Sequence, residues 1–487
     1  MIVLKDILYK VSLEQVQGDT SIQINQIQFD SRLIKDNDVF VAIKGEVVDG
    51  HDYIETAIGK GAIAIICEIL PSVIQKQVTY IVVNNSQESL AHLASNFYQV
   101  PSENLKLVGI TGTNGKTTTA SLLFQLFKNA GFKVGLLSTV KIRVDEKEYN
   151  ATHTTPDSLT INKYLAEMNT AGVEYCFMEV SSHGIAQKRI EGLQFEGGVF
   201  TNLSHDHLDY HKTFKEYRNV KKEFFDALPK KAFALTNADD KNGSYMLQNC
   251  KAKKYNYALK TYADYRGQIL ENGLGGLLLK INDRDVWTKL IGDFNGYNLL
   301  AIYGVADLLG LETVEILQLL SQLNSVSGRF QYTISKQKIT AIVDYAHTPD
   351  ALKNVLSTIN SIRTQNETLI TVVGCGGDRD KDKRPIMGSI AAAMSNKVIF
   401  TSDNPRTENP ETILEQIEKG VAPNDYKKVL SITDRKQAIK TACQMAEKDD
   451  IILVAGKGHE TYQETNGKRI DFDDFKIVKE ELLKLGK

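Results

Sequence analysis

A glycine-rich loop between an apolar strand and a helix constrains this 487-residue sequence more than any other feature. Residues 105–110 (LKLVGI) predict the strand, and apolar residues at helical spacing predict a helix that ends at Gly131. In residues 112–118 (GTNGKTT), glycines let backbone N–H groups approach phosphate oxygens, Lys116 adds a positive charge and Thr117 can bind Mg²⁺. A simple glycine-rich turn is the alternative, but the strand before and the helix after favour a nucleoside triphosphate site.

The composition argues against several other classes of protein. Lys plus Arg number 58 against 60 for Asp plus Glu, so the net charge of −2 gives no reason to expect a nucleic-acid or membrane partner. The five cysteines form no CxxC pair, which favours a reduced, cytoplasmic setting. Lys5 and Asp6 interrupt the apolar start, so we expect neither a signal peptide nor a membrane anchor. We expect a cytoplasmic monomer that acts on small molecules.

The length suggests about three domains of roughly 150 residues each. The first part mixes strands with helices and ends in a linker that Pro101 opens. Its clearest expected elements are strands at 40–45 and 62–68 and a helix at 86–98.

In the second part, strands alternate with helices, which argues for a mainly parallel sheet. The phosphate-loop strand is followed by strands at 175–180 and 198–202 and by a helix at 215–225. A strand, a loop and a helix between 288 and 310 close this part, and the next boundary falls near 325–329.

The third part contains four apolar strands, each followed at once by a polar loop rich in chemical groups. The strands are 339–343, 369–373, 397–401 and 451–455. The loops are 344–350 (DYAHTPD), 374–380 (GCGGDRD), 402–406 (SDNPR) and 456–460 (GKGHE). In a doubly wound sheet these loops share one edge, where ligands bind.

Two acidic or histidine-rich segments are candidates for a metal site. Glu179 ends an apolar strand beside the phosphate loop, where its carboxylate could hold Mg²⁺, although a solvated strand-end acid is the alternative. In the segment 201–211 (TNLSHDHLDYH), His205, His207 and His211 would suit zinc, because 207 and 211 are helical neighbours. A Mg²⁺ shared by His207 and Glu179, or a capped helix start, would fit too, and residue chemistry alone leaves the three open.

Charged residues on the third part's loops suggest recognition of an amino acid. Arg379 and Arg406 could each bind a carboxylate through paired hydrogen bonds, and Glu460 could receive an ammonium group. Together they suit an amino acid with more than one carboxylate, with ordinary surface ion pairing as the alternative. Lys221 and Lys222 receive no role from composition alone.

The order of these motifs resembles the Mur ligases of peptidoglycan synthesis over nearly the whole chain. The shared motifs are DSR (30–32), FVAIKG (40–45), GTNGKTT (112–118), TTPD (154–157), MEVSSHG (178–184), TNLSHDHLDYH (201–211), FNGYN (294–298), Gly328-Arg329, DYAHTPD, GCGGDRDKDKRP, DNPR and GKGHE. The resemblance implies an α/β fold of three domains. These are an N-terminal α/β domain for a UDP-linked substrate (1–103), a central P-loop ATPase domain with a mainly parallel sheet (104–326), and a C-terminal Rossmann-like α/β domain for the incoming amino acid (327–487).

The resemblance also implies a reaction of cell-wall synthesis, which supports cell shape and division. An amino acid is joined to the D-glutamate of UDP-N-acetylmuramoyl-L-alanyl-D-glutamate. ATP phosphorylates the substrate carboxylate, ADP leaves, and the amine attacks the acyl phosphate through a tetrahedral intermediate. Mg²⁺ is the implied cofactor, since Mg²⁺ and cationic side chains stabilise a transferring phosphoryl group.

Site residues follow from the resemblance, position by position. Contacts with ATP are implied for Gly112, Thr113, Asn114, Gly115, Lys116, Thr117, Thr118, Asn295, Arg329 and Asp344. Contacts with the UDP-linked muramoyl-dipeptide are implied for Ser31, Glu46, Val47, Val48, Thr154, Thr155, Ser181, Gln187 and Arg189. Catalytic roles are implied for Lys116, Glu179, His207 and Lys221, and metal binding for Thr117, Glu179, His207 and Lys221. Lys221, four residues after Tyr217, matches the lysine that this family carbamylates to N6-carboxylysine, which selects it over Lys222.

The segment 403–406 (DNPR) resembles the signature of ligases that add meso-2,6-diaminopimelate, whereas lysine-adding relatives lack the arginine. Diaminopimelate has a second carboxylate that can pair with Arg406, and lysine would leave that arginine without a partner. The implied contacts are Arg379, Asp403, Asn404, Pro405, Arg406, Gly456 and Glu460. His205, Asp382 and residues 46–48 depart from the family's pattern.

Other functions remain possible at this point. One is the same reaction with L-lysine or another diamino acid. Another is a ligase like folylpolyglutamate synthetase, against which the DSR, TTPD and DNPR segments argue. A third is a nucleotide-binding regulator without catalysis, which would need neither Lys221 nor the two arginines.

Overall fold

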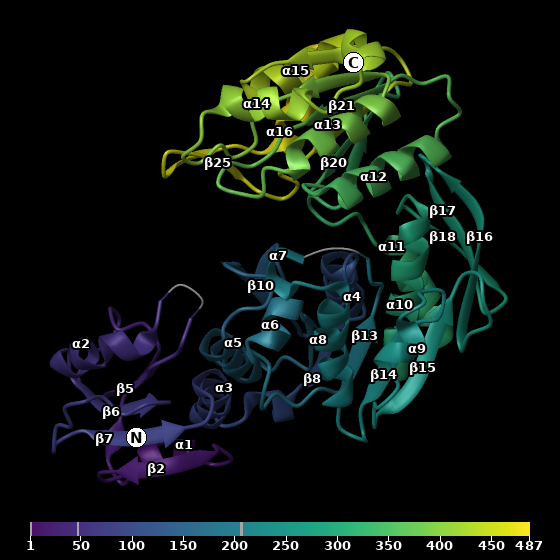
Figure 1. The fold of residues 1–487 in the computed structure, drawn as a ribbon. Coiled ribbons are helices and arrows are strands. Elements are labelled where there is room, and N and C mark those ends of the chain that lie inside the picture. The colour runs from purple at the N-terminus through teal and green to yellow at the C-terminus, as the bar shows by residue number, and fades with distance from the viewer. Residues whose placement is uncertain (1, 46–47, 205–207) are drawn as a thin grey trace. The chain divides into compact units, whose positions relative to one another are not determined.

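The computed structural model describes residues 2–45, 48–204 and 208–487 (Figure 1). Contacts among these residues divide the chain into two compact units. Met1–Asp264 groups with Gly304–Gly310, and Tyr265–Tyr303 groups with Leu311–Lys487. The domain boundaries expected at 103 and 326 therefore stay a prediction, since this division is coarser.

The N-terminal part of the first unit is built on a sheet in the order β2-β7-β6-β5-β4. β4 to β7 run parallel and β2 pairs antiparallel with β7. Apolar side chains cover both faces of this sheet. The strand expected at 62–68 is observed as β6, whereas the strand expected at 40–45 lies earlier, at 38–41, and the chain leaves the sheet before Lys44. The expected helix at 86–98 begins where Asn85 accepts a hydrogen bond from the Glu88 N–H at 2.9 Å. The bounds are β1 Ile2–Val3, α1 Leu4–Ile7, β2 Leu13–Gln17, β3 Gln23–Ile24, β4 Ile27–Gln28, β5 Asp38–Val41, α2 Ile54–Gly59, β6 Ala62–Cys67, β7 Thr79–Val83 and α3 Ser86–Phe97.

The rest of the first unit is the expected mainly parallel sheet, in the order β11-β10-β9-β12-β8-β13-β14-β15. Only β10 and β11, at one edge, are antiparallel among these described strands. Because β8, β12 and β13 are parallel neighbours, their carboxyl ends bring three of the predicted motifs to one edge. The bounds are β8 Lys106–Thr111, α4 Lys116–Asn129, β9 Val134–Leu137, β10 Lys141–Val144, β11 Lys147–Asn150, α5 Ser158–Ala171, β12 Tyr175–Glu179, α6 Ser182–Ala186, β13 Gly197–Phe200, α7 Leu208–His211, α8 Phe214–Asp226, β14 Phe233–Asn237, α9 Gly243–Met246 and β15 Lys253–Ala258.

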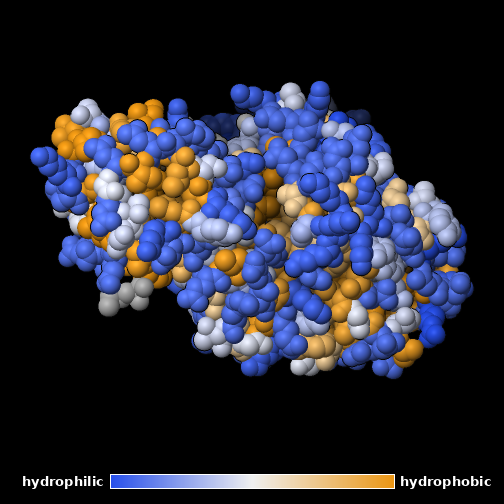
Figure 2. All heavy atoms as spheres, turned by 90° about the horizontal axis from the view of Figure 1, so that it is seen from below, coloured by the Kyte–Doolittle hydropathy of each residue, from blue (hydrophilic) through white to orange (hydrophobic). Residues whose placement is uncertain are grey.

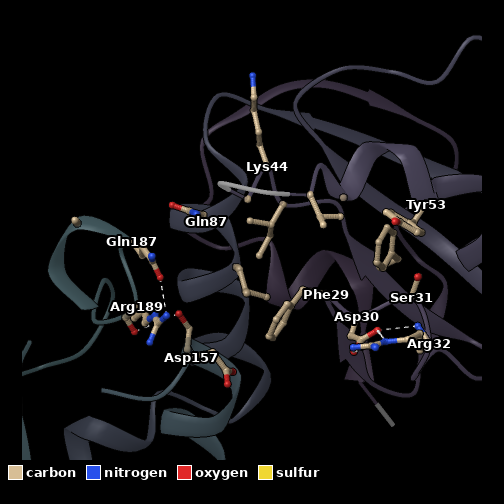
Figure 3. Close-up of a pocket in the computed structure, with 18 of the residues that line it drawn as sticks. Phe29, Asp30, Ser31, Arg32, Lys44, Tyr53, Gln87, Asp157, Gln187 and Arg189 are labelled. Carbon is tan, nitrogen blue, oxygen red and sulfur yellow. Dashed lines mark hydrogen bonds and ion pairs between the residues drawn. The ribbon is translucent and has the colours of Figure 1, made fainter. Parts of the chain in front are cut away.

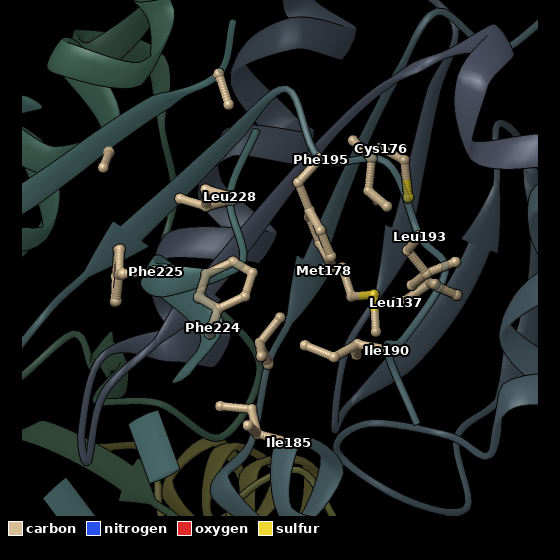
Figure 4. Close-up of a cluster of buried hydrophobic side chains, with 14 of the residues drawn as sticks. Leu137, Cys176, Met178, Ile185, Ile190, Leu193, Phe195, Phe224, Phe225 and Leu228 are labelled. Atoms are coloured by element: carbon tan, nitrogen blue, oxygen red, sulfur yellow. The ribbon is translucent and has the colours of Figure 1, made fainter. Parts of the chain in front are cut away.

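One apolar core fixes helix α8 against this sheet (Figure 4). Phe224 of α8 packs edge-to-face on Phe195 with ring centroids 5.1 Å apart. Tyr217, Phe224, Phe225 and Leu228 form the buried stripe of α8 and the residues after it. Phe224, Phe225 and Leu228 follow Tyr217 by seven, eight and eleven residues, which is the spacing of one helix face. Position 221, four residues after Tyr217, lies on the same face and so faces the sheet too.

The second unit joins an antiparallel hairpin group, β16-β17-β18, to a sheet in the order β19-β20-β24-β21-β22-β23. β20, β24, β21, β22 and β23 are parallel, so the four predicted loops do share one edge. Helices α12, α13 and α14 supply one apolar cluster against this sheet, and α15 and α16 supply another. The bounds are β16 Tyr265–Gly273, β17 Gly276–Ile281, β18 Arg284–Thr288, α10 Asp293–Leu308, α11 Thr313–Gln322, β19 Gln331–Ile334, β20 Thr340–Asp344, α12 Pro349–Ile362, β21 Leu369–Val373, α13 Lys383–Met394, β22 Lys397–Phe400, α14 Pro410–Glu418, β23 Val429–Ser431, α15 Arg435–Met445, β24 Ile451–Ala455, β25 Tyr462–Thr465, β26 Lys468–Asp471 and α16 Asp474–Lys484.

Exposed residues are largely hydrophilic and the cysteines are unpaired, as expected from the composition and from the lack of CxxC pairs. Hydrophilic residues cover most of the face drawn in Figure 2, with apolar patches between them. No helix in the described part of the chain is long and apolar enough to cross a membrane. The five cysteines are buried free thiols, and burial raises the pKa of Cys67 to about 11.

Candidate active site

The phosphate loop depends on glycine at its first position. Gly112 has a φ of +151°, and a Cβ there would stand 1.9 Å from Thr201 Oγ1, where β13 ends. The Thr113 N–H donates to the Asn202 carbonyl oxygen at 2.8 Å, and the Asn114 N–H donates to Asn202 Oδ1 at 2.9 Å. Glycine is needed at 112 because the chain after β8 approaches the end of β13 too closely for a side chain.

Lys116 and Thr117 begin helix α4 and point in different directions. Lys116 Nζ donates to the carbonyl oxygens of Gly112 and Thr113, each at 2.8 Å, so its charge lies over the loop. Thr117 Oγ1 donates to Glu179 Oε2 at 2.9 Å. Glu179 is fully buried, and its other oxygen accepts the Thr139 N–H at 2.7 Å. The structure thus brings two predicted metal ligands, Thr117 and Glu179, together.

The remaining predicted metal ligands are only partly placed. His207 and His205, predicted for a zinc or Mg²⁺ site, lie outside the described residues. His211 is buried and packs against the rings of Tyr217 and His183. Among the described residues, no group of three or more His, Cys, Asp or Glu could hold a metal ion.

Lys221 lies buried beside the phosphate loop. It is 1% exposed, and its Nζ donates to the Gly112 carbonyl oxygen at 3.0 Å and approaches Thr111 Oγ1 at 3.5 Å. The Tyr217 ring lies 4.8 Å from the same Nζ. Lys222 instead forms an ion pair with Asp226 at 2.6 Å. The structure therefore places Lys221, not Lys222, against the phosphate loop.

The residues predicted to hold the muramoyl-dipeptide form a connected network next to Glu179. Thr155 Oγ1 donates to the Glu179 carbonyl oxygen at 2.8 Å and accepts the Ser181 N–H at 2.9 Å. Arg189 donates to the Thr155 carbonyl oxygen and to Gln187 Oε1, each at 2.6 Å. Burial lowers the pKa of Arg189. The network holds an arginine charge ready for an anionic ligand.

A cavity of about 290 Å³ joins this network to the phosphate loop. Lys116, Lys221, Thr154, Thr155, Ser181, Gln187 and Arg189 line it, all of them predicted site residues. His153, Ser182 and His183 line it as well and carried no prediction. In the sequence, Ser182 and His183 lie inside the MEVSSHG motif and His153 directly precedes the TTPD motif, and this was the only signal that pointed to them.

A larger cavity of about 890 Å³ reaches into the N-terminal part (Figure 3). Ser31, Val48, Gln187 and Arg189, which were predicted to bind the UDP-linked substrate, line it, whereas Glu46 and Val47 lie outside the described residues. Asp30 and Arg32 form an ion pair at 2.7 Å on its wall. Phe29 and Tyr53, both about 40% exposed, were not predicted, although exposed aromatic rings in a cavity suit a flat ligand ring.

Of the predicted ATP residues of the second unit, Arg329 and Asp344 lie at one strand end, and Asn295 lies in α10. Asp344, at the end of β20, accepts the Phe330 N–H at 2.7 Å, and Arg329 lies 4.7 Å from the Tyr345 ring. Removal from water raises the pKa of Asp344, and the Arg329 charge opposes that rise. Asn295, in the first turn of α10, is buried and bonds the Ile291 carbonyl oxygen at 2.8 Å.

The two predicted arginines of the amino-acid site flank Gly376. A Cβ at that glycine would lie 3.0 Å from Arg406 Nη1 and 3.9 Å from Arg379 Cγ. Arg406 has a φ of +50°, and its Nη1 donates to the Gly377 carbonyl oxygen at 2.6 Å. Arg379 is exposed and bonds the carbonyl oxygen of Asp378 at 3.1 Å. Within residues 2–45, 48–204 and 208–487, each of these guanidinium groups makes one hydrogen bond, to a backbone carbonyl oxygen, which leaves donors for a ligand.

Asn404, Glu460 and Lys457 form a compact polar group next to Arg406. Asn404 Nδ2 donates to Glu460 Oε2 at 2.8 Å, and Lys457 Nζ donates to Asn404 Oδ1 at 2.8 Å. Asp403 is buried, and its Oδ2 would lie 2.7 Å from a Cβ at Gly456, so glycine is required there. A Cβ at Gly377 would stand 1.9 Å from the Pro405 carbonyl oxygen. Lys457 carried no prediction, although it stands inside the GKGHE motif.

Family models match three successive segments of the chain. The Mur ligase family catalytic domain matches residues 23–98, the Mur ligase middle domain matches 110–306, and the glutamate ligase domain of Mur ligases matches 328–458. This arrangement confirms the predicted α/β fold class and its three-part architecture.

Full-length relatives give the same result. The chain is 54% identical over 485 residues to the UDP-N-acetylmuramoyl-L-alanyl-D-glutamate–2,6-diaminopimelate ligase of Cytophaga hutchinsonii, covering 99% of this chain and 100% of that one. It is 52% identical over 477 residues to the ligase of that name in Phocaeicola vulgatus, covering 98% and 99%. A solved structure of a ligase with the same name superposes with a TM-score of 0.71 at 30% identity, covering 100% of this chain and 99% of that one. With family models over most of its length and full-length relatives above 50% identity, this chain belongs to the Mur ligase family and is a ligase.

Proposed function

We propose that this chain joins meso-2,6-diaminopimelate to the D-glutamate of UDP-N-acetylmuramoyl-L-alanyl-D-glutamate, using ATP. The observation that carries the proposal is the cavity of about 290 Å³ that Lys116 and Lys221 share with Thr155, Ser181 and Arg189. In this cavity, a phosphate-binding lysine and a network that suits a carboxylate face the same space. Near-full-length relatives named for this reaction support the choice of substrates.

The phosphate loop and the cavity lysines suit the activation step. An oxygen of the substrate carboxylate attacks the γ-phosphorus of ATP, the bond from that phosphorus to the bridging oxygen breaks, and ADP leaves. Lys116 and the loop N–H groups stabilise the charge on the transferring phosphoryl group. Arg189 orients the peptide through its side-chain donors. Holding both reactants in one small cavity favours transfer to the carboxylate over transfer to water.

The oxygen donors around Glu179 fit Mg²⁺. Mg²⁺ prefers carboxylate and hydroxyl oxygens, which Glu179 and Thr117 supply within 2.9 Å of each other. We assign Mg²⁺ to these two residues and to His207, where it would neutralise charge on the phosphates. Lys221 would add two oxygens if its amine combined with CO₂ to give a carbamate and a proton, and its buried place beside the loop suits that role.

The amino-acid site suits a diaminopimelate better than lysine. The amine of diaminopimelate attacks the acyl phosphate carbon, a tetrahedral intermediate forms, and phosphate leaves. In our proposal Arg406 pairs with the distal carboxylate and Glu460 accepts hydrogen bonds from the distal ammonium group. Arg379 pairs with the other carboxylate. Lysine has no distal carboxylate. A bound lysine would therefore leave the partly buried Arg406 guanidinium group without an anionic partner.

The experiment that tests the proposal measures phosphate release while each substrate is omitted in turn. We expect release only when ATP, the UDP-linked dipeptide and diaminopimelate are all present. Release without the amino acid would point to a nucleotide hydrolase or regulator, and release with folate as the acceptor would point to a folylpolyglutamate synthetase. All the proposed substrates are small water-soluble molecules, and we propose that the chain meets them as a cytoplasmic monomer.

A further inference from the structure

Lys457 is a fully buried lysine that the proposed reaction does not use. It follows the end of β24, and its Nζ lies 2.8 Å from Asn404 Oδ1 and 3.1 Å from Glu460 Oε2. The Tyr462 ring centroid lies 5.4 Å from the same Nζ. A buried ammonium group is costly unless hydrogen bonds and an opposite charge compensate for lost water. Both compensating partners of Lys457 are residues of the proposed amino-acid site.

The ammonium group fixes which way the Asn404 amide points. Asn404 Oδ1 accepts from Lys457 Nζ and also from the Glu464 N–H at 3.0 Å. Both partners are donors only, so the amide nitrogen cannot occupy that side. Asn404 Nδ2 must therefore point the other way, where it donates to Glu460 Oε2 at 2.8 Å. Without Lys457, the amide would lose its charged donor and keep the Glu464 N–H and the Glu460 carboxylate as partners.

The same ammonium group also fixes the Glu460 carboxylate. Lys457 Nζ and Asn404 Nδ2 both donate to Oε2. Among the described residues these are the side-chain bonds to this carboxylate, so Oε1 remains for a ligand. The Glu460 side chain is 17% exposed, whereas that of Lys457 is 0% exposed, so Glu460 can meet a ligand and Lys457 cannot.

We propose that Lys457 is a positioning residue for the distal amino group of diaminopimelate. It holds Asn404 in one orientation and anchors one oxygen of Glu460, so that the other oxygen accepts the distal ammonium group. Arg406 and Asn404 lie two residues apart on one loop, and the distal carbon of diaminopimelate carries a carboxylate and an amine together. The inference rests on the function proposed above and adds to it a residue that never touches the substrate.

The test compares two amino acids that differ only in that amino group. Diaminopimelate and 2-aminoheptanedioate, which lacks the distal amine, are ligated by wild-type protein and by Lys457→Met at saturating ATP and UDP-linked dipeptide. We expect wild type to prefer diaminopimelate by about tenfold or more in kcat/KM, as the loss of one charged hydrogen bond implies. In Lys457→Met we expect this ratio to fall towards one, through KM for diaminopimelate, while KM for ATP stays within about twofold.

A structural role for Lys457 would give a different result. If the variant loses the same factor with both amino acids and keeps the wild-type ratio, the inference is overturned and the proposed function stands. Wild type that is active but does not distinguish the two amino acids overturns it too. Wild type that fails to ligate diaminopimelate overturns the proposed function and the inference together.

Control variants separate positioning from folding. Lys484→Met removes a lysine that pairs with Glu481 at the same three-residue spacing, on the surface of the same unit, and should leave the ratio unchanged. If Lys457→Met is unfolded by circular dichroism, Lys457→Gln takes its place. The Gln amide carries no charge and both donates and accepts, so it no longer fixes the Asn404 amide, and the ratio must again fall towards one. A folded Gln variant with the wild-type ratio contradicts the inference.

Discussion

Arg406 is the side chain on which the choice of amino acid depends in our account. In the described part of the chain, its guanidinium group makes one hydrogen bond, from Nη1 to the Gly377 carbonyl oxygen at 2.6 Å. The remaining N–H donors can bind a carboxylate. We expect Arg406→Ala to lower kcat/KM for diaminopimelate by roughly 10- to 150-fold, the range for loss of a charged hydrogen bond. KM for ATP should stay unchanged. Steady-state kinetics check this, with the exposed Arg284→Ala as control. Wild-type efficiency with diaminopimelate would remove Arg406 from the site.

Lys221 gives a second prediction at the level of one residue. Its Nζ lies 3.0 Å from the Gly112 carbonyl oxygen in a buried place where a carbamate would put two oxygens beside the phosphate loop. We expect Lys221→Ala to be nearly inactive and to recover part of its activity when a small carboxylic acid such as formate or acetate is added. Lys222→Ala, which removes the ion pair with Asp226, is the matched control. No recovery, together with an unmodified lysine by mass spectrometry of the wild-type protein, would contradict carbamylation.

Lys221 was predicted through the resemblance to the Mur ligases, and Lys457 was missed. The residue types alone gave Lys221 no role, and the structure shows it on the buried stripe of α8, between Tyr217 and Phe224. Lys457 follows a strand end, where no periodicity tells a buried side chain from an exposed one. Its partners Asn404 and Glu460 are 53 and 3 residues away, and only the fold brings Asn404 to it.

At the scale of elements, Arg384 ties helix α13 to the loop that ends before α14. Arg384 is fully buried and bonds both oxygens of Glu408, at 3.0 and 2.9 Å, and Gln416 of α14 at 2.6 Å. Glu408 in turn accepts the Asp378 N–H on the loop before Arg379. This ion pair therefore connects the two loops that carry the predicted arginines.

The Glu408 carboxyl makes stability depend on pH. The hydrogen bonds from Arg384 lower its pKa from 4.5 to about 2. A carboxyl whose pKa is lowered by folding stabilises the protein fully above its unfolded value and loses that effect as the pH falls towards its folded value. We expect Glu408→Gln to lower Tm at pH 7 and the difference from wild type to shrink between pH 4.5 and 2. Thermal melts check this, with exposed Glu415→Gln as control. A difference that is constant with pH would contradict the assignment.

The strands that carry the site were predictable as elements. The strands at 369–373 and 451–455 are confirmed to the residue, because each is apolar, apart from the buried Thr371, and is covered on both faces of a parallel sheet. The sharing of one edge by their loops followed from the parallel order. The hairpin β25-β26 was not predicted, although Glu464 within it donates its N–H to Asn404. Its strands are mostly polar and lack the alternation that marks a half-buried strand.

At the scale of the whole chain, the position of the second domain boundary is the open point. Residues 327–487 contain the whole β19–β24 sheet and nearly all of its apolar clusters. Ile291 also joins one of those clusters, and Tyr332 Oη donates to the Lys289 carbonyl oxygen at 2.8 Å. The contacts therefore group 265–303 with this part, whereas the motifs place the boundary at 326.

Two fragments decide between these divisions. We expect residues 327–487 alone to fold, because a domain with its own core folds by itself. Circular dichroism and thermal unfolding of fragments 327–487 and 265–487 measure this. Cooperative unfolding of both supports the boundary at 326. A fragment 327–487 that stays unfolded while 265–487 folds would move the boundary to 264.

The central claim is that this chain adds diaminopimelate to the UDP-linked dipeptide. The most direct test gives the protein ATP, Mg²⁺ and UDP-N-acetylmuramoyl-L-alanyl-D-glutamate with equal amounts of meso-diaminopimelate, L-lysine and L-ornithine, and identifies the product by mass spectrometry. We predict a single product that has gained one diaminopimelate unit, with ADP and phosphate formed in equal amounts. A product that has gained lysine or ornithine, or no ligated product while ATP is consumed, would contradict it.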